Sequence, residues 1–138
     1  MSGVSAQSMG GLRSGWSATV DDCAISGGWT SDGEEFVVAD AAGGVTVFDG
    51  KRGDLKWAKK QVHKGGSLAT SVHPTEKKFA TTGQDGQLII WNVAETEKEQ
   101  VIEIGKGWVE NVSWSPDGNF VATSLSKTVY VYSATGEE

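Results

Sequence analysis

Residues that could carry out metal or nucleophilic chemistry are few in this chain and lie far apart. The histidines are His63 and His73, and the only cysteine is Cys23. Their separations do not resemble the short spacings of zinc sites, so we expect no metal ligands. His73 falls in a predicted turn, where we expect it to be solvated.

Adjacent carboxylates and glycine pairs also do not predict a catalytic or phosphate-binding site. The carboxylate pairs are Asp21-Asp22, Glu34-Glu35 and Glu137-Glu138. Neighbouring side chains of a strand point to opposite faces, and turns are wet, so these pairs are poor candidates for general acid–base catalysis. Gly43-Gly44 and Gly65-Gly66 precede no helix and do not predict a phosphate site. We therefore expect no catalytic residue, no cofactor, no small-molecule substrate and no enzymatic activity.

One group of polar residues has a clear chemical logic, and that logic is structural. His63, Thr81, Asp85 and Trp91 follow one another at separations of 18, four and six residues. A buried indole N–H needs an acceptor, which a threonine hydroxyl supplies. The imidazole of His63 could link that hydroxyl to a carboxylate. A chain of hydrogen bonds from Trp91 through Thr81 and His63 to Asp85 would satisfy every polar group.

Short strands are needed to bring these four residues together. Three apolar runs, Ser67–Val72, Phe79–Thr82 and Leu88–Trp91, are separated by polar turns. Asp85-Gly86 between the last two runs is a strong hairpin signal. The stretch from His63 to Trp91 therefore predicts an antiparallel meander of three strands.

The same pattern of runs occurs three times with a period near 40 residues. The aromatic residues that close the third run of each copy are 43 and 41 residues apart: Phe48, Trp91 and Tyr132. The preceding runs begin at Phe36, Phe79 and Phe120. Trp29-Thr30-Ser31-Asp32-Gly33 and Trp114-Ser115-Pro116-Asp117-Gly118 mark the end of the first run in two copies. Three landmarks that keep register indicate a true repeat.

The spacing of His63, Thr81, Asp85 and Trp91 resembles the structural tetrad of a WD-repeat (WD40) blade. Asn92 stands where that family usually has an aspartate. The resemblance implies an all-β fold of three four-stranded antiparallel blades, a partial β-propeller. It also implies that His63 lies before the first strand, Thr81 on the second, Asp85 in the following turn and Trp91 on the third. In that family the tetrad is structural.

The tetrad is incomplete in the other two copies. Val38 and Ala42 occupy the threonine and aspartate positions of the first copy, where Phe48 replaces the tryptophan. In the third copy, either Ala122 or Thr123 takes the threonine position and Ser126 the aspartate position. These blades are expected to depend on packing, because phenylalanine has no N–H to satisfy.

The repeats predict blade boundaries at 16–62, 63–104 and 105–138. The third blade lacks a fourth strand of its own. The segment 1–15 is expected to be an N-terminal arm, and its residues Met9–Arg13 could supply that strand. When Met9 is aligned with Val101, Trp16 falls on Trp108. A flexible arm remains the alternative.

Two tryptophans are candidate partner-binding residues. The alignment puts Trp16 and Trp108 in loops between blades, which line one face of the propeller in the resembled family. Large aromatic side chains in such loops are typical of binding hot spots. The alternative is that each packs on its own blade. Trp57, on a predicted outer strand, is expected to make a peripheral packing contact.

Composition limits the classes of partner. The chain has 138 residues, 38% of them hydrophobic, and a net charge of −6. The absence of a basic cluster argues against nucleic-acid binding. No apolar run approaches the roughly 20 residues of a membrane span, and the N-terminus has no secretory signal pattern. Together with the single cysteine, these features predict a cytoplasmic protein that does not bind membranes.

Three blades pose a problem of closure, because propellers typically have about 4–8 blades. An open arc leaves two blade faces bare. We therefore expect a non-catalytic protein-interaction or scaffold module. The alternatives are a building block of a multi-chain propeller, with a six-bladed homodimer favoured, and a fragment of a longer propeller protein.

Overall fold

The computed structural model describes residues 15–94 and 99–133, and no helix occurs within them. The described residues form eleven strands in the order β1 (Ala24–Trp29), β2 (Glu35–Asp40), β3 (Val45–Asp49), β4 (Leu55–Lys59), β5 (Ser67–Val72), β6 (Lys78–Gly83), β7 (Gln87–Asn92), β8 (Glu99–Glu103), β9 (Val109–Trp114), β10 (Phe120–Leu125) and β11 (Thr128–Ser133).

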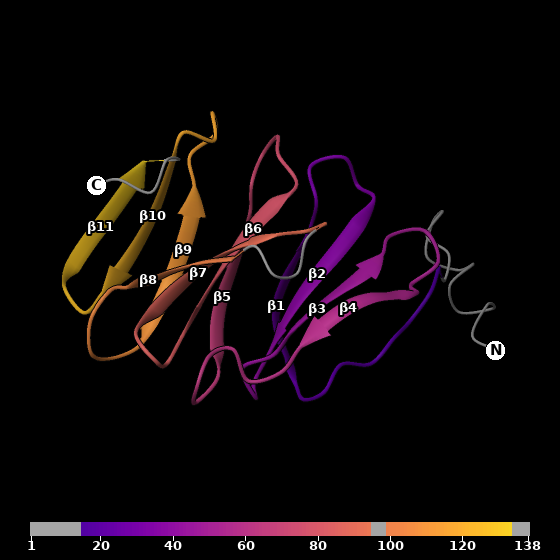
Figure 1. Cartoon of the computed structure of the whole chain (residues 1–138), viewed down its shortest axis with the longest axis horizontal. Coiled ribbons are helices and arrows are strands. Elements are labelled where there is room, and N and C mark those ends of the chain that lie inside the picture. The colour runs from indigo at the N-terminus through magenta and orange to yellow at the C-terminus, as the bar shows by residue number, and fades with distance from the viewer. Residues whose placement is uncertain (1–14, 95–98, 134–138) are drawn as a thin grey trace, which may run out of the picture.

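The strands form three antiparallel meanders, which we call blades 1, 2 and 3. Blade 1 contains β1 to β4, blade 2 contains β5 to β8, and blade 3 contains β9 to β11. β5 lies between β1 and β9, so the first strands of the blades are neighbours and the sheets fan out from them (Figure 1). The predicted all-β blade architecture is confirmed. The strand predicted at Met9–Arg13 lies outside the described residues.

Equivalent residue pairs in the three blades are defined by strand register. Phe36 lies opposite Phe48 in blade 1, and Phe79 opposite Trp91 in blade 2. In blade 3 the residue opposite Tyr132 is Val121.

Phe120 therefore does not occupy the position of Phe79, as the sequence alignment predicts. The hairpin between β10 and β11 explains the shift. Leu125 pairs with Thr128, so the turn is only Ser126-Lys127, and Ser126 has a positive φ of 55°. The corresponding turn of blade 2 is longer, because Thr82 pairs with Leu88. The tighter turn shifts strand β10 by one residue and turns Phe120 to the opposite face.

Apolar side chains between adjacent blades form two cores. The first joins blades 1 and 2 and contains Val37, Val45, Val47, Phe79, Ile89, Trp91 and Val93. The second joins blades 2 and 3 and contains Ala80, Leu88, Ile104, Val109, Trp114, Val121 and Tyr132. Full burial of one such large apolar side chain stabilises a fold by about 1.5–3 kcal/mol. The blades are thus held to one another by hydrophobic packing, and the backbone bonds hold each blade together.

Candidate functional site

The structure brings His63, Thr81, Asp85 and Trp91 together in blade 2. The indole Nε1 of Trp91 donates to Thr81 Oγ1 at 2.9 Å. Thr81 Oγ1 lies 2.8 Å from His63 Nε2, and His63 Nδ1 lies 3.1 Å from Asp85 Oδ1. His63, Thr81 and Trp91 are buried. The network connects strands β6 and β7 to the loop that precedes β5.

The donors and acceptors of these hydrogen bonds define the protonation state of the network. Thr81 Oγ1 already accepts from Trp91, so its own proton points to His63 Nε2. The Asp85 carboxylate accepts only, so the imidazole proton lies on Nδ1. Burial lowers the pKa of His63 below its ordinary value, although the Asp85 carboxylate acts in the opposite direction. His63 is therefore a neutral linker in this network.

Asp85 also organises the backbone around it. Its carboxylate accepts from the backbone N–H of Gln87 and of Lys64, each at 3.2 Å. The first bond closes the turn between β6 and β7, and the second holds the loop between blades 1 and 2. With these partners the four side chains satisfy one another and the adjacent backbone. This arrangement is suited to holding the fold.

His73 is buried, with 2% of its surface exposed, so the prediction of a solvated turn residue is wrong. Its Nε2 donates to the carbonyl of Gly118 in blade 3 at 3.0 Å. Its Nδ1 accepts from the backbone N–H groups of Thr75 and Glu76 at 3.1 and 2.9 Å. The ring also packs edge-on against Trp114, with 4.7 Å between centroids. The imidazole thus joins a turn of blade 2 to a turn of blade 3.

An ion-pair cluster joins the β1–β2 turn of blade 1 to the β5–β6 turn of blade 2. Asp32, Glu34 and Glu35 converge closely enough to suggest a cation site. The ammonium of Lys77 takes that place, 3.1 Å from Asp32, 3.3 Å from Glu34 and in contact with Glu35. Lys56 lies 2.6 Å from the other oxygen of Glu35. Two lysines therefore neutralise this acidic cluster.

The pKa values of the cluster follow from these contacts. The backbone N–H of Glu34, assisted by Lys77 and Thr30, lowers the pKa of Asp32 to about 2. Burial opposes ionisation of Glu35, but its hydrogen bonds to Lys56 and Lys77 outweigh burial, so the pKa of Glu35 is lowered. Burial opposes the charge of Lys77, yet the three carboxylates raise its pKa. Asp32, Glu35 and Lys77 are therefore held charged, which fits an ion-pair tie between the blades.

Comparison with known proteins agrees with this geometry. The model of the WD40 family, described as WD domain, G-beta repeat, matches residues 58–92 and 98–133. These segments run from β4 to β7 and from β8 to β11, so each begins at a fourth strand and ends at the third strand of the next blade. Together they span about half of the chain.

The chain belongs to the WD40 repeat family.

Relatives match parts of this WD-repeat chain. It is 32% identical over 62 residues to guanine nucleotide-binding protein subunit beta of Nicotiana plumbaginifolia, covering 45% of this chain and 16% of that protein. It is 35% identical over 80 residues to p21-activated protein kinase-interacting protein 1-like of Xenopus laevis, covering 56% and 22%. The Protein LST8 homolog of Drosophila melanogaster is 27% identical over 71 residues, covering 51% and 23%. The chain thus spans less than a quarter of the length of these relatives.

A solved structure shares the fold. The β-propeller domain of Cps50 (Swd1) from Myceliophteria thermophila aligns with a TM-score of 0.75 at 11% sequence identity. The alignment covers 88% of this chain and 37% of that chain. The three WD blades therefore have the arrangement of consecutive propeller blades.

Among the described residues, no helix is both long and apolar enough to cross a membrane.

The other two WD blades satisfy the tetrad positions differently. In blade 1 the tetrad positions carry no such side chain, and the buried Asp40 at the neighbouring position of Gly83, which the sequence patterns do not single out, accepts from the backbone N–H of Ala42 and Gly44, both at 2.9 Å. In blade 3 it is Thr123, not Ala122, that takes the position of Thr81, and its hydroxyl donates to the Asn111 carbonyl at 2.6 Å. Each substitute holds a local turn or strand pair.

Trp57 is an inter-blade contact in this WD arc, whereas the sequence predicts a peripheral one. Its ring lies 5.9 Å from Trp91 and 6.4 Å from Phe79, both in blade 2. Its Nε1 donates to the carbonyl of Val93 at 2.7 Å. A side chain from the outer strand of blade 1 thus completes the core of blade 2.

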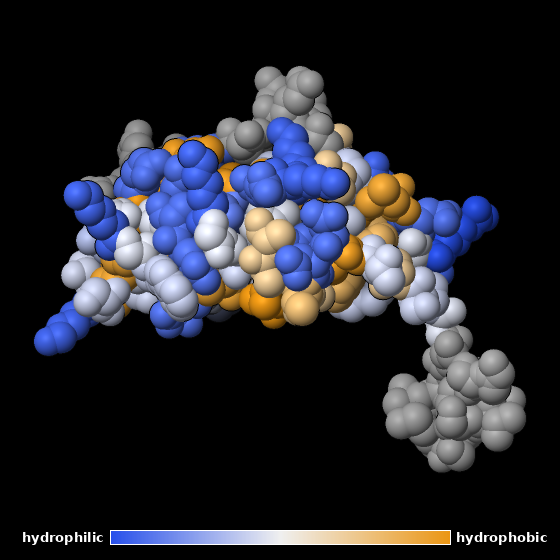
Figure 2. Space-filling view, turned by 90° about the horizontal axis from the view of Figure 1, so that it is seen from below, coloured by the Kyte–Doolittle hydropathy of each residue, from blue (hydrophilic) through white to orange (hydrophobic). Residues whose placement is uncertain are grey.

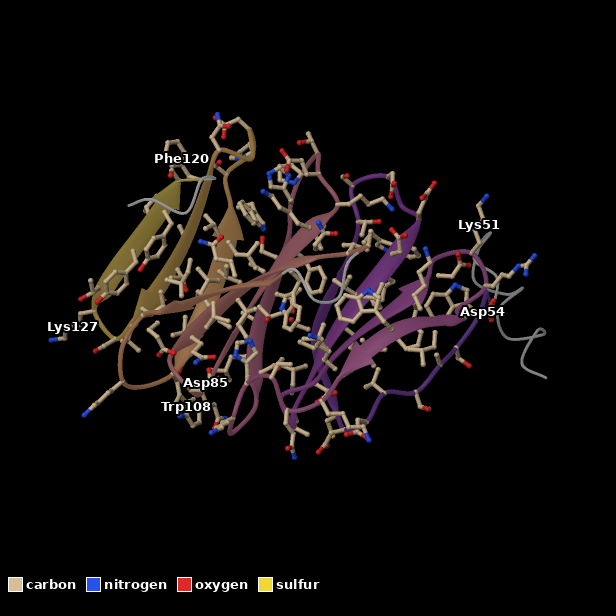
Figure 3. The ribbon with its side chains drawn as sticks, in the orientation of Figure 1. Lys51, Asp54, Asp85, Trp108, Phe120 and Lys127 are labelled. Carbon is tan, nitrogen blue, oxygen red and sulfur yellow. The ribbon has the colours of Figure 1, made fainter. Side chains whose placement is uncertain are left out.

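The candidate binding residues Trp16 and Trp108 lie in different environments. Trp16 packs on Phe48 of blade 1 with 5.8 Å between ring centroids, and its Nε1 donates to the Gly50 carbonyl at 2.8 Å. Trp108 is 54% exposed and is seen at the lower edge of the molecule in Figure 3. The two do not share a loop position, in contrast to the sequence alignment.

Proposed function

We propose that this chain is a non-catalytic protein-interaction module that binds through the outer faces of its end blades. The proposal rests on the large apolar side chains that lie on those faces. The blade 1 lateral face consists of the exposed Trp29 and Leu55 and the half-buried Phe36, and the blade 3 lateral face consists of Phe120, Val129 and Val131, all exposed.

Strand alternation places these residues on the faces that point away from blade 2. Val37, Val45 and Val47 pack toward blade 2, so the alternating residues Phe36 and Phe48 face outward. In blade 3, Val121 and Tyr132 pack toward blade 2. Their neighbours Phe120 and Val131 therefore face outward, 48% and 49% exposed.

Exposed apolar clusters of this kind mark interaction surfaces, because water-exposed hydrophobic area is costly for an isolated protein. Hydrophobic residues also reach the surface in several patches between hydrophilic ones on the side seen in Figure 2. Two relatives are named as a protein subunit and as a kinase-interacting protein, which favours a protein partner. The neutralised polar groups described above leave little support for catalysis.

A second candidate function is a building block of a multi-chain propeller, in which a homodimer makes six blades. It is favoured by the similarity of the lateral faces to the buried inter-blade faces. Val45 and Val47 are fully buried against blade 2, whereas Val129 and Val131 occupy the corresponding places in blade 3 and are exposed. Six blades lie within the usual range of about 4–8.

Photo-cross-linking tests the interaction role and separates the two candidates. Benzoylphenylalanine replaces Phe120 on the blade 3 lateral face, and in a control variant it replaces exposed Lys127 in the adjacent turn. Both chains are illuminated alone and in extract of the native cell. An adduct specific to position 120 with another protein supports the interaction module, and an adduct with a second copy supports the building block. Equal labelling at both positions, or no protein adduct at all, contradicts the proposal.

A further inference from the structure

The lysine and arginine residues of this acidic chain are concentrated around β4. Although the net charge is −6, six of the 12 cationic residues lie between Lys51 and Lys64, a segment that contains a single carboxylate. Lys51 and Arg52 precede β4 in the turn after β3, and Lys60 directly follows the strand. We call these three residues, together with Lys56 within β4, the basic edge.

The basic edge faces solvent. Both cations of the β3–β4 turn are exposed, and Lys51 points away from the body of the protein (Figure 3). The side chain of Lys60 is 76% exposed, and its ion pair with Asp21 spans 3.8 Å. An exposed pair of this kind is weak, so a carboxylate from a partner can replace Asp21. Lys56 differs, because it bonds Glu35 at 2.6 Å as part of the cluster between blades 1 and 2.

β4 is the edge strand of blade 1, because within the described residues it pairs with β3 alone. Hydrogen bonds at the end of β3 show which of its residues bond to which neighbour. The N–H of Gly50, just after β3, donates to the Glu34 carbonyl beside β2, whereas the N–H of Asp49 donates to the Asp54 carbonyl beside β4, each at 2.7 Å. Even-numbered residues of β3 therefore bond toward β2, and odd-numbered residues bond toward β4.

The backbone N–H and C=O of Ala58 consequently point away from the sheet, because Ala58 lies opposite Thr46, an even-numbered residue of β3. Ala58 is exposed, and it lines an open hollow of about 280 Å³ together with Leu55, Lys60 and Asp21, among others. Outward backbone groups on an accessible edge strand are a template for pairing with another extended chain.

Charged residues on an edge strand can also serve only to prevent aggregation, but that role does not require positive charge. β8, the corresponding strand of blade 2, reads EQVIE and carries carboxylates in place of lysines. In a protein of net charge −6, carboxylates would protect β4 equally well. The positive sign of the basic edge therefore indicates attraction of an acidic partner, which the rest of the acidic chain would repel.

We propose that β4 binds an extended acidic segment of another protein, which adds to blade 1 as a further strand. Backbone hydrogen bonds to Ala58 hold the segment, and its carboxylates meet Lys51 and Arg52 at one end and Lys60 at the other. β4 has five residues and spans about 17 Å, so a segment of similar length with acidic residues at both ends fits. The inference goes beyond the proposed function, because it uses the edge of blade 1 and not the lateral faces.

A protein segment is favoured over a nucleic acid as the occupant. Both are anionic, but only a polypeptide offers N–H and C=O groups at the spacing of an edge strand. Ala58→Pro separates the two, because it removes a backbone donor and leaves the charge of the basic edge unchanged. Proline is tolerated on edge strands where the N–H faces away from the sheet, so this variant is expected to keep its fold.

The probe is a fluorescein-labelled synthetic peptide of five alternating valine and threonine residues with two glutamates at each end. Fluorescence anisotropy measures its binding to the full chain. Ala58→Pro should raise the dissociation constant at least tenfold, whereas the control Ala58→Val, which keeps the N–H, should leave it within about twofold. The melting midpoint of each variant is measured on the same preparation and should stay close to that of the wild type.

Charge reversal provides a second measurement that does not depend on proline. Lys51→Glu should raise the dissociation constant at least fivefold at low salt. Lys127→Glu makes the same change in an exposed turn at the opposite end of the molecule and should leave it within about twofold (Figure 3). If Ala58→Pro does not fold, this pair of variants decides the outcome.

Three results would overturn the inference. The acidic peptide could bind the wild type no better than a peptide with lysines in place of its glutamates. It could bind folded Ala58→Pro, or Lys51→Glu, as tightly as the wild type. Single-stranded DNA could bind more tightly than the peptide and bind Ala58→Pro equally well, which would identify a general polyanion site. None of these results changes the outcome of cross-linking from position 120, so the proposed function of the lateral faces is tested separately.

Discussion

Trp57 in blade 1 and Val93 in blade 2 are joined by a 2.7 Å hydrogen bond from the indole N–H to the backbone carbonyl. The bond lies inside the core between the blades, where Val93 is buried. The outer strand of one blade is thereby fixed to the strand end of the next.

The Trp57–Val93 bond predicts the effect of Trp57→Phe. This change keeps a packed ring but leaves the Val93 carbonyl without its donor, and we expect a loss of about 1–3 kcal/mol in unfolding free energy. Urea unfolding measures it. Trp108→Phe is the matched control, because Trp108 is exposed, and should change stability by less than about 0.5 kcal/mol. Equal effects of the two variants would show that the bond contributes nothing.

The hydrogen-bond network of blade 2 predicts that Asp85→Ala destabilises the fold by about 1–3 kcal/mol. The variant leaves the His63 N–H and the N–H groups of Gln87 and Lys64 without their acceptor. Thermal unfolding provides the measurement, and exposed Asp54→Ala provides a control of the same chemistry. An unchanged melting midpoint in Asp85→Ala would mean that the network does not form.

The lowered pKa of His63 predicts that the protein loses stability in mild acid. Its pKa is lowered in the folded state, so below the ordinary value of 6.5 the unfolded chain binds the proton more readily. Unfolding free energy should therefore fall as the pH drops from 6.5 toward the folded pKa, and should level off below it. The lowered pKa values of Asp32 and Glu35 matter only at lower pH, below their ordinary values of 3.8 and 4.5.

The comparison of wild type with His63→Gln isolates this contribution. Urea unfolding at pH 7.5, 6.5 and 5.5 measures the unfolding free energy of both proteins. The variant should be less stable at pH 7.5, but its unfolding free energy should depend less on pH because it has no imidazole to protonate. Parallel pH profiles for the two proteins would refute the assignment of the acid sensitivity to His63.

Trp108 is proposed as a contact for a protein partner. Trp108→Ala should weaken binding of a protein partner by on the order of tenfold or more, as for other exposed aromatic hot spots. Its melting midpoint should stay close to that of the wild type, because the side chain is 54% exposed. Binding titration and a melting curve are measured on the same preparation. Lost stability with intact binding would assign Trp108 to packing.

Local patterns predict most of the fold, because they depend on residues close in sequence. The strand runs, the Asp85-Gly86 turn and the 43- and 41-residue periods all follow from alternation and turn chemistry. The four residues of the network are also readable from spacing, since the loop and hairpin that join them are short.

Features that depend on contacts between residues far apart in sequence, or on an unusual turn, could not be predicted in this way. The burial of His73 depends on the Gly118 carbonyl, 45 residues away. The shift that exposes Phe120 comes from a two-residue turn whose Ser126 adopts a conformation unusual for a side-chain-bearing residue. The packing of Trp16 on Phe48, 32 residues away, is hidden because an alignment on Gly-Trp pairs brings Trp16 to Trp108.

The most direct test of the central claim, that the chain binds protein through its lateral faces, is photo-cross-linking from position 120 in cell extract, with and without the double substitution Val129→Glu/Val131→Glu on the blade 3 lateral face. The account predicts a protein adduct, either with another protein or with a second copy, that the folded double variant loses. An adduct of equal yield in the double variant, or no protein adduct in either chain, would contradict it.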